Sequence, residues 1–460
     1  MGHPYIPNDT ETIRRRMLEV IGVENAKDVF SDIPSGVRFE RRLDLPAPRS
    51  EYEARSEVEC ILAKNRTERE FLSFLGGGVW SHIVPAAVDS IAGRAEFVTS
   101  YTPYQPEISQ GMLQALYEYQ SLICELLDMD IANASMYDFA SAVGEAARMA
   151  CRVTGRRRVL YPHFISPNRL STLRTYTKPC GIELVEVKND VETGQLCIED
   201  LKHKASSETA ALYIENPSYF GTIATDAQGL SDIVHDKGGL LIVGVDPTSL
   251  GILKPPGQYE ADVAVGEGQP LGSYVNFGGP LLGLFACREE TRLIRQMPGR
   301  IIGMTRTKDG ETGYCMVLQT REQHIRREKA TSNICTNEAL LAIRAAVYIS
   351  LLGPTGLRRL GEYLASAAQY AVDLLSKLDG IKAPLFRAPH FKEFTVALKK
   401  DGLTIQQLNA RLLERGIIGG HDLTTAFPEV GDASLFCVTE RHTGKDIEKL
   451  ASCLADVLEA

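Results

Sequence analysis

The feature that most constrains the fold is a series of short apolar runs that alternate with helical stretches in the middle of the chain. The runs recur at similar intervals and occupy residues 158–161, 181–187, 210–214, 239–243 and 262–265. Strand-like runs separated by helices are typical of right-handed β–α–β units. We therefore expect an α/β protein with a largely parallel sheet covered by helices.

The regions on either side of this series have a different character. The first 70 residues are charged and interrupted by prolines, as in residues 43–48, which indicates short helices and an arm that wraps another surface. After about residue 330 the spacing of apolar residues predicts helices over 337–352 and 361–378 and strands over 394–398 and 434–438. The expected organisation is an arm (1–70), a large α/β domain (71–330) and a smaller C-terminal α+β domain (331–460).

Charge and composition exclude several classes of function. The net charge of −9 argues against a broad nucleic-acid binder and against attachment to anionic lipid by charge. We find no apolar run long enough for a transmembrane helix and no secretory signal pattern, so we expect no membrane association. The ten cysteines show neither CxxC spacing nor a zinc-like cluster with histidine, which favours reduced thiols, a cytoplasmic location and no metal site.

The first candidate site is the segment 100–111, which packs tyrosines, prolines, glutamines and one acid into the entry of a helix. Prolines fix the backbone, and the hydroxyl and amide groups then supply positioned hydrogen-bond donors and acceptors. The alternative is a rigid helix entry whose Glu107 interacts with the helix dipole.

Three further segments have both a functional and a structural interpretation. The glycines before His82 permit a close backbone approach, although this histidine is more simply a packed one. Ser141 begins a helix of small residues, where it either helps hold a phosphate or caps the helix. Asn216–Pro217 follows a strand, at the edge of the sheet where α/β proteins bind ligands, but it also reads as a plain turn.

Taken together, residues 101–111, 216–221 and 318–336 resemble the P protein of the glycine cleavage system, glycine dehydrogenase (decarboxylating). The resemblance covers nearly the whole chain and implies the aspartate-aminotransferase-like fold of enzymes that depend on pyridoxal 5'-phosphate (PLP). In some members one long chain holds two homologous halves, whereas in others the halves are separate subunits of an α2β2 assembly. This chain looks like the α, or N-terminal, half.

Two positions that the resemblance assigns to PLP chemistry are altered here. Where the catalytic half has a His–Lys pair, this chain has Gly268 and Gln269, and an amide cannot form the Schiff base. Gly244 stands where the catalytic half carries an acid against the pyridine nitrogen. Asp246 and Lys254 form the alternative pair, which would have to rescue an independent cofactor site.

The resemblance therefore implies that a β subunit carries PLP and that this chain holds none covalently. The complex would decarboxylate glycine and transfer the aminomethyl group to the lipoyl group of the H protein. The residues of this chain expected to complete the site are Tyr101, Thr102, Tyr104, Gln105, Glu107 and Asn216. Two alternatives stay open: a purely structural subunit, and a self-sufficient PLP enzyme using Lys254 or Lys329.

Overall fold

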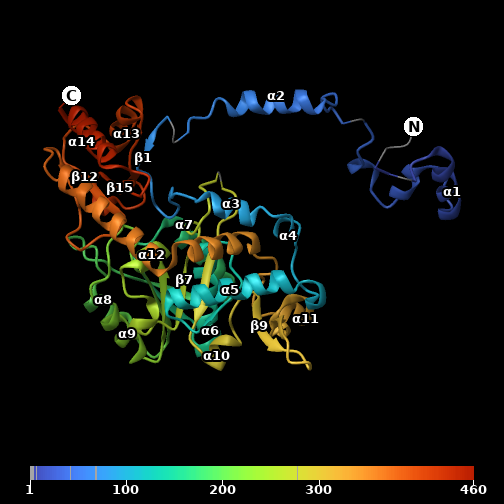
Figure 1. Ribbon diagram of the computed structural model, residues 1–460, viewed down its shortest axis with the longest axis horizontal. Helices are drawn as coiled ribbons and strands as arrows, with labels where there is room; N and C mark the ends of the chain where they lie inside the picture. The colour runs from blue at the N-terminus through green and yellow to red at the C-terminus, as the bar shows by residue number, and fades with distance from the viewer. Residues whose placement is uncertain (1–4, 7, 42, 68–69, 277, 460) are drawn as a thin grey trace. The chain divides into compact units, whose positions relative to one another are not determined.

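The structure is a computed structural model that describes residues 5–6, 8–41, 43–67, 70–276 and 278–459 (Figure 1). The chain forms two compact units, Met1–Arg66 and Thr67–Ala460. The larger unit contains both the central sheet and the C-terminal sheet. The boundary expected near residue 330 stays a prediction.

Helix-capping residues define the secondary structure of the first unit. In α1 (Glu11–Ile21) the Thr10 side chain caps the first turn, and Gly22 ends the helix in a left-handed conformation. In α2 (Glu51–Leu62) Ser50 and Glu53 form a reciprocal capping box. No described residue of these two helices is buried, so their apolar side chains have no core within this unit.

The larger unit is built on a seven-stranded sheet with the order β2-β8-β7-β6-β5-β3-β4. The five strands that match the predicted runs pair in parallel, and β2 and β8 add antiparallel partners at one edge. This confirms the predicted mainly parallel sheet. The strands are β2 (Ile131–Ala132), β3 (Arg158–Pro162), β4 (Glu183–Val187), β5 (Thr209–Glu215), β6 (Leu240–Val245), β7 (Val263–Glu267) and β8 (Gly283–Cys287).

Helices cover both faces of this sheet because its central strands are apolar on both sides (Figure 1). In β6, Leu241 and Val243 belong to one core, whereas Leu240 and Ile242 belong to the other. The first core includes α5 (Gln110–Leu127), α8 (Ile198–Lys204), α9 (Ala227–His235) and part of α12 (Ala339–Leu375). The second includes α6 (Phe139–Thr154), α7 (Pro167–Thr177) and α10 (Thr291–Ile294).

The C-terminal part has its own four-stranded antiparallel sheet, with the order β11-β12-β15-β14, and a separate core. The strands expected over 394–398 and 434–438 are present as β12 and β15. The elements are β11 (Ile381–Lys382), β12 (Glu393–Leu398), β14 (His421–Asp422), β15 (Ala433–Cys437), α13 (Ile405–Glu414) and α14 (Gly444–Glu459).

Several short elements complete the architecture around these two sheets. The sequence did not predict the antiparallel hairpin of β9 and β10. The short elements are β1 (Leu72–Ser73), α3 (Ala86–Ala92), α4 (Ala95–Val98), β9 (Ile301–Arg306), β10 (Thr312–Val317), α11 (Gln323–Arg326) and β13 (Ile417–Ile418).

Helix α12 joins the central and C-terminal parts. The helices predicted over 337–352 and 361–378 both belong to this segment. Its helical backbone is broken at Gly353, which has a φ of 60° and is followed by a proline. Among the described helices, α12 alone is long and apolar enough to cross a membrane. Its first half packs on α5 and its second half on α14, as expected of a core helix.

Candidate functional site

The position expected to carry the acid of a cofactor site is closed by neighbouring side chains. A Cβ atom built on Gly244, near the end of β6, would lie 2.7 Å from the Phe139 ring and 2.8 Å from the Tyr213 hydroxyl. Both contacts are shorter than real Cβ contacts, so an aspartate here would require its neighbours to move. The Phe139 and Tyr213 side chains therefore fill the space that an acid at this position would need.

A buried ion pair stands beside this position. The Arg169 guanidinium, from α7, makes two 2.7 Å hydrogen bonds to the Glu215 carboxylate at the end of β5. The Tyr213 hydroxyl donates to the same carboxylate at 2.9 Å, and Arg169 lies 4.6 Å from the centre of the Phe139 ring. The Glu215 carboxylate is therefore paired within the chain, and two of the guanidinium nitrogens of Arg169 are engaged in that pair.

The amide at the expected lysine position is itself part of the packing. Gln269 is fully buried, and its side chain accepts a hydrogen bond from the Trp80 backbone N–H at 3.0 Å. Its amide nitrogen donates to the carbonyls of Trp80 and Ser273 at 2.9 and 2.8 Å. Gln269 thus ties the glycine-rich segment before Trp80 to the loop after β7.

The structure places a lysine that the sequence did not single out in this same region. Lys392, just before β12, is 1% exposed, and its Nζ lies 2.7 Å from an Asp246 carboxylate oxygen. The ammonium also lies 3.8 Å from the centre of the Trp80 ring and 2.9 Å from His82 Nε2. The partner of Asp246 is therefore Lys392, whereas Lys254 and Lys329 are exposed.

The protonation of His82 follows from its two partners. Lys392 has only donors, so His82 Nε2 accepts from it, and Nδ1–H donates to Glu440 at 2.8 Å. Burial, and next the charge of Lys392, lower the pKa of His82, which keeps the ring neutral. His82 is thus a packed histidine that links the segment before α3 to the C-terminal sheet.

The start of α6 does not offer a phosphate cradle. Asp138, not Ser141, is the N-cap, and Ser141 completes a capping box by accepting from the Asp138 N–H. The Phe139 N–H donates to Glu267 and the Ser141 N–H donates to Asp138, so these two amides of the first turn are already used. Burial raises the pKa of Glu267 to about 8, although backbone N–H bonds oppose that rise.

The space left among these side chains is too small for PLP. The cavity lined by Trp80, Phe139, Arg169, Asp246 and Lys392 measures about 20 Å³. That is room for about one water molecule, whereas ligand sites typically measure ~300–1,000 Å³. The residues present do not fit the cofactor, and the geometry gives no support to a self-sufficient PLP enzyme.

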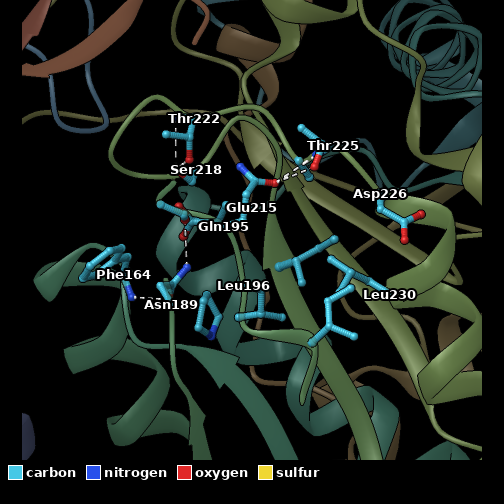
Figure 2. A pocket seen from close by; sticks show the side chains of 15 residues that line it. Phe164, Asn189, Gln195, Leu196, Glu215, Ser218, Thr222, Thr225, Asp226 and Leu230 are labelled. Carbon is cyan, nitrogen blue, oxygen red and sulfur yellow. Dashed lines mark hydrogen bonds between the residues drawn. The ribbon is translucent and has the colours of Figure 1, made fainter. Parts of the chain in front are cut away.

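Figure 2 shows a second cavity, of about 120 Å³, beside the end of β5. Asn189 accepts from the Phe164 N–H and donates to the Gly194 carbonyl. Gln195 likewise donates to a backbone carbonyl and accepts from Thr225. These two amides serve the local backbone, so they do not mark a binding site.

The tyrosine-rich segment lies elsewhere, on an open face at the entry to α5. The Tyr101 side chain is 70% exposed, and its hydroxyl lies 2.9 Å from the Thr336 hydroxyl. The Tyr104 hydroxyl accepts a 2.7 Å hydrogen bond from Arg300, and the His324 ring meets the Tyr104 ring edge-on. Two motifs far apart in sequence, 101–111 and 318–336, therefore meet here.

The other predicted residues of this segment also face outward. Gln105 and Glu107 are exposed, and Thr102 is half-buried. Tyr101 and Thr102 line a groove of about 560 Å³ that also includes Arg94, Glu96 and Phe97. Sequence reasoning missed Arg300, because a lone arginine before a strand carries no local signal.

Asn216 is not placed with these residues. It is buried after β5, and its side-chain oxygen accepts from the Ala224 N–H at 3.1 Å. Its N–H donates to the Gly244 carbonyl. The geometry supports the turn interpretation for this residue.

Comparisons with known proteins give one consistent result. The model of the family described as glycine cleavage system P-protein matches residues 3–454. The probable glycine dehydrogenase (decarboxylating) subunit 1 of Staphylothermus marinus is 48% identical over 99% of this chain and 98% of its own. That of Aeropyrum pernix is also 48% identical, over the full length of both chains.

Solved structures agree with the sequence relatives. A glycine decarboxylase (P-protein) of the glycine cleavage system, in inhibitor-bound form, superimposes with a TM-score of 0.88 and 38% identity, covering 99% of this chain and 100% of that one. A sphingosine-1-phosphate lyase of Burkholderia pseudomallei shares the fold at a TM-score of 0.67 and 15% identity, over 93% of this chain and 94% of its own.

Proposed function

This chain belongs to the glycine cleavage system P-protein family as a subunit of glycine dehydrogenase (decarboxylating), and we propose that it completes the active site of a PLP-bearing partner subunit. The observation that carries this proposal is the contrast between a filled cofactor pocket and an open polar loop. The pocket has about 20 Å³ of free space, whereas the groove beside Tyr101 has about 560 Å³.

In this proposal the partner, and not this chain, carries PLP. The cofactor would supply the electron sink for the carbanion that remains when glycine loses CO2. Gln269 and Gly244 support this division, since neither can anchor PLP and the side chains of this chain occupy the space around both. The aminomethyl group would then pass to the lipoyl group of the H protein within a cytoplasmic α2β2 assembly.

An apolar face next to the tyrosine loop supports the position of the partner. A groove of about 420 Å³ runs between α3, α5 and the first half of α12. It shares Ile91 and Phe97 with the groove that Tyr101 lines. Helix α12 is strongly apolar, and its Leu351 side chain lines this groove in a residue that is 53% exposed, so this apolar face is uncovered in the isolated chain. A subunit that covered this face would come to lie beside Tyr101.

The residues of the loop then have a chemical role. Glycine is too small to be selected by shape, so recognition depends on polar groups that orient its carboxylate. We assign this role to the polar side chains of residues 101–107, which are Tyr101, Thr102, Tyr104, Gln105 and Glu107. Asn216 takes no direct part, because its side chain holds the turn after β5.

Borohydride reduction tests which subunit carries PLP. We expect the pyridoxyl label only on the partner after the reconstituted complex is freed of unbound PLP and reduced, and none on this chain when it is purified alone, freed of unbound PLP and reduced. Peptide mapping identifies the labelled lysine. Label on Lys392, Lys254 or any other lysine of this chain would contradict the proposal.

Substitution of the tyrosines separates an active-site role from a purely structural one. We expect Tyr104→Phe to lower the exchange of labelled CO2 into glycine roughly tenfold, and Tyr101→Phe to lower it by a smaller factor, since each loses one hydrogen bond to the substrate. Tyr370→Phe is the matched control, because the Tyr370 hydroxyl is also bonded to a side chain, Glu448, but lies on the second half of α12. Wild-type rates in both loop variants would leave this chain a structural subunit.

A further inference from the structure

Arg300 is a buried arginine that the proposed function does not yet use. It precedes β9 and is 2% exposed. One of its terminal nitrogens donates to the Tyr104 hydroxyl at 2.7 Å, and its Nε donates to the Cys335 carbonyl at 2.8 Å. Its guanidinium also lies 4.7 Å from the centre of the Tyr104 ring. A single side chain therefore connects both motifs of the open loop.

The backbone that carries Arg300 is held in place from several sides. The carbonyls of Met297 and Gly299 both accept hydrogen bonds from the buried Arg321. The Arg300 carbonyl accepts from the Ala134 N–H at 2.8 Å, next to the edge of the central sheet. Because these groups fix the backbone, the guanidinium has a defined direction toward Tyr104.

The bond from Arg300 determines the polarity of the Tyr104 hydroxyl. A guanidinium has only donors, so the Tyr104 oxygen accepts, and its own proton must point elsewhere. The Cys335 sulfur lies beside this group, 3.7 Å from the same Arg300 nitrogen, and sulfur is a weak acceptor that an oxygen of a ligand can replace. Burial raises the pKa of Tyr104, which keeps this proton in place at neutral pH.

Glu322 limits the role that the charge of Arg300 can play. A carboxylate oxygen of this buried residue lies 3.7 Å from the same terminal nitrogen of Arg300. The positive charge is therefore largely compensated within the chain. Arg300 is suited to hold a hydroxyl in a fixed orientation rather than to bind an anion directly.

We propose that Arg300 is a positioning residue that presents the Tyr104 hydroxyl as a hydrogen-bond donor to a carboxylate oxygen of the substrate. This inference rests on the proposed function, since it requires the loop to face the active site of the partner. Beyond the proposed function, this inference adds one residue outside the loop, Arg300, and states which group donates in one hydrogen bond to the substrate. The class of ligand that such a donor selects is a small carboxylate.

A double-mutant cycle in the reconstituted enzyme tests the proposal. We expect Tyr104→Phe and Arg300→Met each to lower the exchange rate roughly tenfold, and the double variant to be no slower than the slower single variant. Arg300→Lys should recover part of the rate, because one ammonium can reach the Tyr104 hydroxyl or the Cys335 carbonyl but not both. If Arg300→Met does not assemble with the partner, the same cycle is completed with Arg300→Lys.

The control and the contradicting outcomes are distinct. Arg152→Met removes another arginine, which is partly buried and bonds to the side chain and backbone of Gln296. It has no hydrogen bond or ring contact with a tyrosine among the described residues, so this variant should leave the rate unchanged. Two outcomes would overturn this inference alone, both with a lowered exchange rate in Tyr104→Phe. In the first, the rate losses of the two single variants multiply in the double variant. In the second, the Arg300 variant that completes the cycle has the wild-type rate. A wild-type rate in Tyr104→Phe would overturn the role of the loop and this inference together.

Discussion

The filled pocket and the open tyrosine loop use similar side chains in opposite ways. In the pocket, Arg169 and Lys392 bond to carboxylates of the same chain and are shielded from water. At the loop, Arg300 is equally buried, but Tyr104, whose hydroxyl it holds, is 43% exposed as a residue. Buried cations thus pair with carboxylates inside the pocket, whereas at the loop a buried cation orients the hydroxyl of an exposed tyrosine.

This difference shows how the charged groups of the filled pocket are stabilised within the chain. Buried charges are tolerated only when paired, so the charged groups in the filled pocket must be satisfied by other groups of this chain. The pairs Arg169–Glu215 and Lys392–Asp246 do this. The pocket has become part of the core, and the exposed polar groups lie at the loop.

The largest effect is expected from breaking the ion pair in the pocket. Lys392→Met leaves the Asp246 carboxylate buried without its partner, which should lower the free energy of unfolding by about 3–5 kcal/mol. Urea denaturation of the isolated chain measures this change. A loss below about 1 kcal/mol would mean that water reaches the pocket and that it is not closed.

A surface pair provides the control for this prediction. Lys204 and Asp200 on α8 are also 2.7 Å apart, but both side chains are partly exposed. Lys204→Met should therefore cost only about 0–1 kcal/mol. Equal losses in both variants would remove the distinction between a closed pocket and the surface.

A smaller effect is expected from pH. Burial and the neighbouring Lys392 lower the pKa of His82, so below about pH 6.5 the unfolded chain binds a proton that the folded chain does not. Stability should therefore fall as the pH falls through this range, by at most about 1.4 kcal/mol per pH unit from this residue.

Comparison with His82→Gln isolates this contribution. Glutamine can still accept from Lys392 and donate to Glu440, but it does not titrate. The difference in unfolding free energy between wild type and variant should shrink as the pH is lowered from 7 to 5. A constant difference would show that His82 is not held neutral.

The sequence predicted the elements whose signal is local and missed the partners that only the fold brings together. The apolar runs predicted β3 to β7 because buried parallel strands are apolar along their whole length. Gln269 and Gly244 were identified through the family resemblance, and the structure shows why neither can be replaced in isolation. The sequence predicts that these two residues cannot anchor PLP, but it does not predict which side chains pack around them.

Lys392 and Arg300 show the limit of that reasoning. Lys392 is 146 residues from Asp246 in the sequence, and Arg300 is 196 residues from Tyr104, so no local pattern connects either pair. The sequence offers Lys254, the nearest lysine, as the partner of Asp246, whereas the fold pairs Asp246 with Lys392. The ion pair of Lys392 depends on the packing of the C-terminal part against the central sheet, whereas the hydrogen bond of Arg300 depends on the packing of β9 against the entry to α5.

The smallest effect on stability is expected at the loop, where Thr336→Val removes the hydroxyl partner of Tyr101. Both residues are exposed, so the free energy of unfolding should change by no more than about 0.5 kcal/mol. If the loop faces the active site of the partner, the exchange rate should nevertheless fall a few-fold, because Tyr101 loses its fixed orientation. Thr336→Ser, which keeps the hydroxyl, should retain the wild-type rate.

Two outcomes in Thr336→Val would contradict this prediction. An unchanged exchange rate would show that the position of Tyr101 does not depend on this hydrogen bond. A large loss of stability would mean that the loop is as much a part of the core as the pocket.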